Sequence, residues 1–162
     1  EGAISVGEEH RASVVMLRLI GRLGPRFSKR GRKRGSIVLG AAPGDHHGVP
    51  VALTSDLLRG EGFTVVDLGA DTPAMSFAEA ARGAERLIAV GISVTNPGSE
   101  EAVAFTIAGI RREVDCPVVV GGAGLTDPVL AESLGADVIT TSATEALEAF
   151  KRLAEDRTRH QA

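Results

Sequence analysis

The sequence contains neither tryptophan nor tyrosine, and its 162 residues include only five phenylalanines and one cysteine. A single cysteine excludes an intrachain disulfide framework and any all-cysteine zinc site. So few aromatic rings provide no stacking platform for nucleic-acid bases or for a flavin ring. The apolar runs fall well short of the roughly 20 residues that a membrane-spanning helix requires, and no signal peptide is recognisable. We therefore expect a soluble, cytoplasmic protein without a membrane partner.

The acidic and basic residues nearly balance, and the formal net charge is −3. The chain as a whole is therefore no general binder of polyanions. Six basic residues nevertheless gather in one short stretch, which is typical of a solvated linker. They are Arg26, Lys29, Arg30, Arg32, Lys33 and Arg34. Because no recognition-helix unit is present, we expect nucleic acid to be bound only through a module outside this chain.

Short runs rich in β-branched residues alternate with amphipathic stretches from Ser36 onward, which is typical of parallel strands buried on both faces. The predicted strands are 36–39, 64–68, 87–93, 117–120 and 138–140. The predicted helices are about 50–60, 74–86, 99–114, 127–134 and 143–155. This alternation predicts one α/β domain, with a doubly wound five-stranded parallel sheet in the flavodoxin-like order 2-1-3-4-5.

The first 25 residues have a different pattern. Ser5 and Glu8 have the spacing of a capping box, and the apolar residues after them recur at helical intervals. The pattern predicts an amphipathic helix of about 17 residues that ends at Gly24-Pro25. One such helix has no core of its own, so it must pack on the α/β body, on a partner chain or on further helices.

The loops that follow the first, third and fourth strands should meet at one edge of the sheet, where open parallel sheets bind ligands. The first of these loops contains Asp45 and His47, and the other two are rich in small residues. A carboxylate two positions from an imidazole can accept the ring N–H and leave the other nitrogen free for a metal. A metal that brings its own equatorial ligands needs only one such imidazole.

These loops resemble the cobalamin-binding domain family, whose signature is Asp-x-His-x-x-Gly, then Ser-x-Leu or Ser-x-Thr, then Gly-Gly. The corresponding residues are Asp45-His46-His47-Gly48-Val49-Pro50, Ser93-Val94-Thr95 and Gly121-Gly122, with proline in place of the final glycine of the first element. The resemblance implies that His47 replaces dimethylbenzimidazole as the lower ligand of cobalt, with Asp45 as its hydrogen-bond partner. It assigns cofactor contacts to Asp45, His46, His47, Gly48, Ser93, Thr95, Gly121 and Gly122.

Residues 6–10 further resemble the Glu-His element in the helical cap of light-sensing adenosylcobalamin regulators. This resemblance implies that Glu9 and His10 cover the upper face of the corrin, and that His10 ligates cobalt after photolysis. It also implies a sensory photoreceptor that signals by a change in a homo-oligomer or in contacts with a cap partner. The domain organisation that we expect is a partial cap at 1–25, a basic linker at 26–35, a Rossmann-like cobalamin-binding domain at 36–157 and a tail at 158–162. The expected cofactor is adenosylcobalamin; some relatives also bind a bilin, but no residue here identifies a bilin site.

The main alternative is a corrinoid methyl carrier, with methylcobalamin, or a small cobalamin-binding subunit of a methyltransferase or mutase. Either would need a partner, because the chain has no arrangement of base and nucleophile that makes a complete enzyme. A phospho-receiver domain requires Asp where the third strand ends in Ser93. Gly40 and Gly44 do not fit a dinucleotide fingerprint. Cys116 is expected to be a small core residue.

Overall fold

The computed structural model describes residues 5–125, 129 and 133–160. The helices are α1 (Val6–Phe27), α2 (Gly48–Gly60), α3 (Ala74–Gly83), α4 (Glu100–Glu113) and α6 (Ala143–His160). The strands are β1 (Ser36–Ala41), β2 (Thr64–Asp67), β3 (Leu87–Ser93), β4 (Val118–Gly121) and β5 (Val138–Thr140). They form one parallel sheet in the order β2-β1-β3-β4-β5. The predicted fold class and strand order are confirmed.

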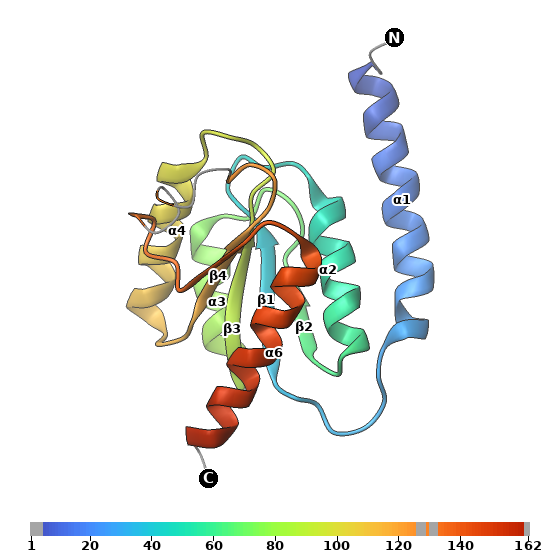
Figure 1. Ribbon diagram of the computed structural model, residues 1–162. Helices are drawn as coiled ribbons and strands as arrows, with labels where there is room; N and C mark the ends of the chain where they lie inside the picture. Colours follow the sequence, from blue (N-terminus) through green and yellow to red (C-terminus); the bar gives the residue numbers. More distant parts are fainter. Residues whose placement is uncertain (1–4, 126–128, 130–132, 161–162) are drawn as a thin grey trace.

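Two apolar layers enclose the sheet, one on each face. The helices α3 and α4 supply Phe77 and Ile107 to one layer, whereas α2 and α6 supply Leu58 and Phe150 to the other (Figure 1). The central strands β1 and β3 are buried along almost their whole length, but the edge strand β2 is partly exposed. Burial on both faces explains why the central strands lack the apolar–polar alternation of a half-exposed sheet. The layers position the strand ends that build the site.

The ends of two helices differ from the prediction. The helix α1 begins with the predicted capping box at Ser5 and Glu8, but it runs to Phe27 with Pro25 inside it. The predicted end at Gly24-Pro25 is therefore wrong: the helix continues for two residues after Pro25, although Pro25 has no N–H to donate to the carbonyl four residues earlier. The helix α6 continues to His160, so residues 158–160 extend it instead of forming a tail. The helix predicted at 127–134 lies largely outside the described residues.

The helix α1 packs along α2 and extends past its N-terminal end (Figure 1). Gly24 is buried at this contact, where a Cβ atom would collide with the carboxylate of Asp56. The α/β body therefore supplies the packing surface that α1 needs. Several apolar side chains of α1 remain exposed: Val14, Val15, Met16, Leu17, Leu19, Leu23 and Phe27.

The basic linker joins α1 to β1 at the end of the sheet opposite the ligand-binding edge (Figure 1). Its last basic residue, Arg34, lies 5.1 Å from the centroid of the Phe63 ring and 3.5 Å from the Glu155 carboxylate. Cys116 is buried as expected, and burial raises the pKa of its thiol to about 11. Within the described residues, we find no helix with both the length and the apolar character needed to cross a membrane.

Candidate functional site

The loop that follows β1 holds a fully buried carboxylate, that of Asp45, at the carboxyl edge of the sheet. Its Oδ1 atom accepts hydrogen bonds from His47 Nδ1 at 2.7 Å and from the His47 backbone N–H at 3.0 Å. Its Oδ2 atom accepts a bond from the backbone N–H of Thr95, at 2.6 Å. The loop after β3 thus fixes the orientation of the carboxylate that holds the imidazole.

The charge state of this pair follows from its contacts. Burial by itself would raise the pKa of Asp45, but the hydrogen bonds from Thr95 and His47 hold it below its usual value. Asp45 is therefore ionised at neutral pH and accepts a hydrogen bond from the Nδ1–H of the His47 ring. In the neutral imidazole this leaves the lone pair on Nε2. The His47 side chain is 40% exposed, so the protein does not enclose the imidazole.

Asp71, which follows β2, supports the same loop. Its Oδ1 atom accepts the Gly44 N–H at 2.8 Å, and its own N–H donates to the Asp45 carbonyl at 2.7 Å. Asp71 adopts a left-handed backbone with φ 47°, a conformation that short polar side chains tolerate better than most residues. Sequence reasoning did not identify this contact, because nothing local relates residue 71 to residue 44. His46 is 77% exposed, with Nδ1 3.8 Å from Asp71 Oδ2.

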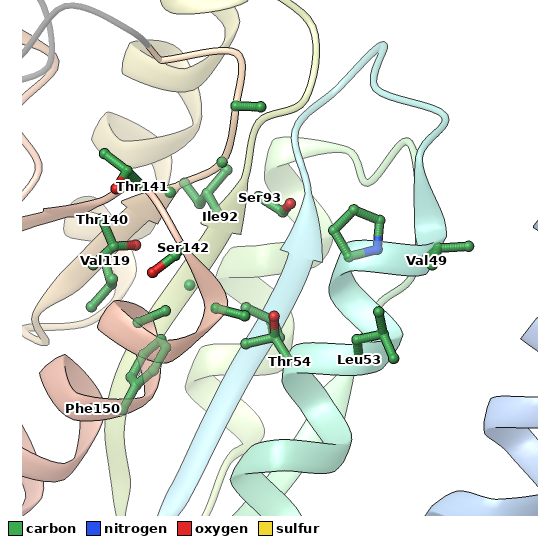
Figure 2. A pocket seen from close by; sticks show the side chains of 18 residues that line it. Val49, Leu53, Thr54, Ile92, Ser93, Val119, Thr140, Thr141, Ser142 and Phe150 are labelled. Carbon is green, nitrogen blue, oxygen red and sulfur yellow. The ribbon is translucent and has the colours of Figure 1, made fainter.

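A cavity of about 320 Å³ opens beside this loop, between α2 and α6 and over the ends of β1, β3 and β4 (Figure 2). Three of the predicted contact residues, Ser93, Gly121 and Gly122, line it. Sequence reasoning missed the walls that the helices supply, because no pattern in the sequence relates α2 to α6. The helix residues are Val49, Pro50, Leu53 and Thr54 of α2 and Ala143, Ala146 and Phe150 of α6; Thr140, Thr141 and Ser142, from the end of β5 to the start of α6, complete the wall.

The glycines at the end of β4 let the neighbouring segments pack closely beside the cavity. A Cβ atom on Gly122 would collide with the Val94 carbonyl, and Gly122 also has a left-handed φ of 134°. A Cβ atom on Gly121 would collide with the Thr140 hydroxyl. Small residues here let a slender, partly apolar group pass between the helices and lie against the sheet. This lining is compatible with the nucleotide tail of a corrinoid; His47 itself does not line the cavity, which begins two residues later at Val49 and Pro50.

The remaining predicted residues are placed as follows. Thr95 contacts Asp45 through its backbone and does not appear in the cavity lining. Gly48 opens α2 directly after His47. Glu9 extends from α1 with Oε1 4.0 Å from His47 Nε2, and His10 is exposed. Among the residues that the structure describes, no cluster of three or more His, Cys, Asp or Glu side chains could hold a metal ion.

A cavity at the carboxyl edge of a doubly wound sheet, with an aspartate-held imidazole beside it, defines a cofactor-binding α/β domain. The model of the B12 binding domain matches residues 35–151. The chain therefore belongs to the B12-binding domain family, and the predicted membership in the cobalamin-binding domain family is confirmed.

Known relatives are corrinoid proteins. The dimethylamine corrinoid protein of Methanosarcina barkeri is 35% identical over 127 residues, which cover 76% of this chain and 58% of that protein. Trimethylamine corrinoid protein 1 of Methanosarcina mazei is 32% identical over 121 residues, or 72% of this chain and 55% of that protein. The chain thus spans somewhat more than half the length of these relatives.

Solved structures share the fold. The monomethylamine corrinoid protein of Methanosarcina barkeri superposes with a TM-score of 0.69 at 24% identity, over 90% of this chain and 70% of that one. The methanol:cobalamin methyltransferase complex of the same organism gives a TM-score of 0.69 at 21% identity, over 94% of this chain and 58% of that one. At these identities the solved structures show the fold alone. The dimethylamine and trimethylamine corrinoid proteins favour the alternative of a corrinoid carrier, and they give the photoreceptor and signalling interpretation no support.

Proposed function

We propose that this chain is the corrinoid-carrying module of a methyl-transfer system, with His47 as the lower ligand of cobalt. The observation that carries the proposal is the 2.7 Å contact between Asp45 Oδ1 and His47 Nδ1, which leaves Nε2 as the unbonded ring nitrogen for a metal. An imidazole whose other nitrogen is bound to a carboxylate has a fixed tautomer and greater basicity as a ligand.

Each residue of the site has a defined task in this proposal. His47 supplies the axial nitrogen, and Asp45 holds its ring with the help of the Thr95 N–H. Ser93, Gly121 and Gly122 receive the nucleotide tail in the cavity, while His46 and Gly48 shape the turn that carries His47. When bound, a corrinoid supplies a cobalt centre that can accept a methyl group from one partner and pass it to another.

The proposed partner is a separate methyltransferase subunit, and the proposed physiological form is methylcobalamin instead of adenosylcobalamin. This choice rests on the relatives named above, among which are methylamine corrinoid proteins and a methyltransferase complex. In this proposal, partner binding depends on the open carboxyl edge of the sheet, where His47 is accessible. Dimerisation of this chain is not required.

The lower ligand can be tested by electron paramagnetic resonance of the cobalt(II) form. Wild-type protein labelled with ¹⁵N-histidine should show axial-nitrogen splitting into a doublet, whereas unlabelled protein should show a triplet. His47→Ala should lose this isotope dependence, and His46→Ala, a change in the adjacent and more exposed histidine, should retain it. If the wild-type protein labelled with ¹⁵N-histidine still shows a triplet, the cofactor's own base ligates cobalt, and the proposal is overturned.

The carrier function itself needs a second measurement. Bound methylcobalamin should lose its methyl group to a thiol acceptor when a cognate methyltransferase is added. The visible spectra of the loaded His10→Ala protein, in the dark and after illumination, should equal those of the loaded wild-type protein, because the carrier proposal gives His10 no contact with cobalt. Green light that alters the elution volume of the adenosylcobalamin-loaded protein, and fails to do so in His10→Ala, would instead support light sensing.

A further inference from the structure

The segment between β2 and α3 is hydrogen-bonded to the end of β1, from which the loop of the site begins. The Ala41 N–H donates to the Gly69 carbonyl at 2.8 Å, and the Thr72 N–H donates to the Ala41 carbonyl at 3.1 Å. A Cβ atom on Gly40 would lie 2.9 Å from the Thr72 hydroxyl, so the two segments also pack closely. The segment 69–72 therefore has a fixed position relative to the end of β1.

The loop after β1 makes a tight turn just before the proposed cobalt ligand. The Asp45 N–H donates to the Ala42 carbonyl at 3.0 Å, and Pro43 and Gly44 occupy the two central positions of the turn. Gly44 has a left-handed φ of 80°, and proline followed by such a glycine is typical of a type II turn. The hydrogen bond that closes the turn does not use the Gly44 N–H, so this donor needs a partner outside the turn.

Asp71 is that partner, and it contacts the turn at two points. Its Oδ1 atom accepts the Gly44 N–H at 2.8 Å, and its own N–H donates to the Asp45 carbonyl at 2.7 Å. From the side of β3, the Thr95 N–H donates to the Asp45 carboxylate at 2.6 Å. The main chain of Asp45 is thus held by the segment after β2 and its side chain by the loop after β3. Both contacts fix the residue that binds the His47 ring.

The backbone of Asp71 has a conformation that these contacts explain. Its φ is 47°, and among the residues that the structure describes Arg86 is the other non-glycine residue with a positive φ. This region is unfavourable for L-residues, although aspartate and asparagine tolerate it better than most. Unfavourable backbone conformations persist where the surrounding structure holds them, and they cluster at functional sites. Here the surrounding structure is the turn that precedes the proposed cobalt ligand.

We propose that Asp71 is a positioning residue for the cobalt ligand, and that it acts on His47 through Gly44 and the main chain of Asp45. Asp71 contacts neither cobalt nor the corrinoid in this proposal. It holds the turn in the one arrangement in which the Asp45 carboxylate meets both the Thr95 N–H and the His47 ring. This inference rests on the proposed function, since it takes His47 to bind cobalt.

The test measures the affinity for methylcobalamin, followed by its visible spectrum, in two variants at position 71. Asp71→Gly removes the carboxylate but accepts the left-handed backbone, so it should weaken binding roughly 2- to 10-fold, the effect of one net hydrogen bond. Asp71→Asn keeps an oxygen that can accept the Gly44 N–H and tolerates the same backbone, so it should bind as the wild type does. Arg86→Gly is the control, because it changes the other left-handed residue, at the amino end of β3, and it should leave the affinity unchanged.

A double-mutant cycle separates the positioning of His47 from a merely structural role. If Asp71 acts through His47, the loss caused by Asp71→Gly should disappear in a His47→Ala background, because no imidazole remains to be positioned. Circular dichroism should show that each variant is folded. A loss of the same size in both backgrounds would overturn the inference, and so would an Asp71→Asn protein that binds as weakly as Asp71→Gly.

The outcomes separate this inference from the proposed function. If the cobalt(II) spectrum of the wild-type protein shows no splitting that depends on labelled histidine, the proposed function fails and this inference fails with it. If that splitting is present but a folded Asp71→Gly protein binds methylcobalamin as tightly as the wild type, only this inference is wrong. A loss in Asp71→Gly that is absent in Asp71→Asn and depends on His47 supports the inference.

Discussion

Asp45 and Thr95 join two loops of the site through one hydrogen bond: the Thr95 backbone N–H donates to Asp45 Oδ2 at 2.6 Å. The other oxygen of the same carboxylate holds the ring and the backbone of His47. The end of β3 therefore controls the orientation of a histidine that follows β1. Because these loops lie 50 residues apart in the chain, the geometry of the proposed cobalt ligand depends on the assembled sheet.

Asp45→Asn should weaken cobalt ligation while leaving the fold largely intact. The amide has one acceptor oxygen where the carboxylate has two, so a donor from Thr95 or His47 loses its partner. Changes to the hydrogen-bond partner of a metal ligand typically cost about 10–100-fold in metal affinity. Titration with methylcobalamin, followed by its visible spectrum, measures the loss. Asp67→Asn, at the edge strand, should bind as the wild type does; equal affinities for the wild type and Asp45→Asn would argue against the assigned role.

The dependence of stability on pH should also change in Asp45→Asn. Burial tends to raise the pKa of Asp45, but the hydrogen bonds from Thr95 and His47 lower it overall in the folded state. The stabilisation is thus complete above the unfolded-state pKa of about 3.9 and is lost as pH falls through the lower, folded-state pKa. Urea unfolding across this acid range should show a shallower pH dependence for the variant. Parallel curves for the two proteins would contradict this expectation.

Gly121→Ala should destabilise the protein and narrow the cavity. The added methyl group would collide with the Thr140 hydroxyl across the β4–β5 pair, and overpacking of this kind typically costs about 1–3 kcal/mol. Gly83→Ala is the matched control, because nothing lies within 4 Å of its Cβ position in α3. Thermal unfolding of the two variants should separate them, with Gly83→Ala equal to or more stable than the wild type. If Gly121→Ala were instead the more stable variant, β5 would have to move away from the added methyl group without loss of stability.

Gly24→Ala should loosen the contact between α1 and α2. Its Cβ atom would collide with the Asp56 carboxylate, which is held by Arg59 at 3.0 Å. Gly21→Ala lies on the same helix with open space around its Cβ position, so it should only gain helix propensity, about 0.5–1 kcal/mol. Amide hydrogen exchange in α1 should accelerate in Gly24→Ala and slow in Gly21→Ala. If the rate of exchange changed in the same direction in both variants, the contact between α1 and α2 would not depend on Gly24.

Much of the fold could be read from the order of apolar runs, because buried parallel strands and amphipathic helices have different periodicities. The strand 87–93 agrees with β3 at both ends. The end of α1 could not be predicted in the same way, since a proline usually ends a helix and no pattern in the sequence indicates that α1 continues past Pro25 to Phe27. Asp71 and Phe150 could not be assigned to the site, because their partners, Gly44 and Gly91, are remote in sequence.

The order of residues alone determined the class of sheet, the histidine with its neighbouring aspartate, and the glycines at the strand ends. These features are local: each depends on the spacing of a few residues or on the periodicity of one element. Only the tertiary structure decided that Thr95 fixes Asp45, that α2 and α6 wall the cavity, and that Phe150 lines it. Those relationships arise when distant segments pack together, and the packing of side chains across a sheet produces no periodic pattern in the sequence.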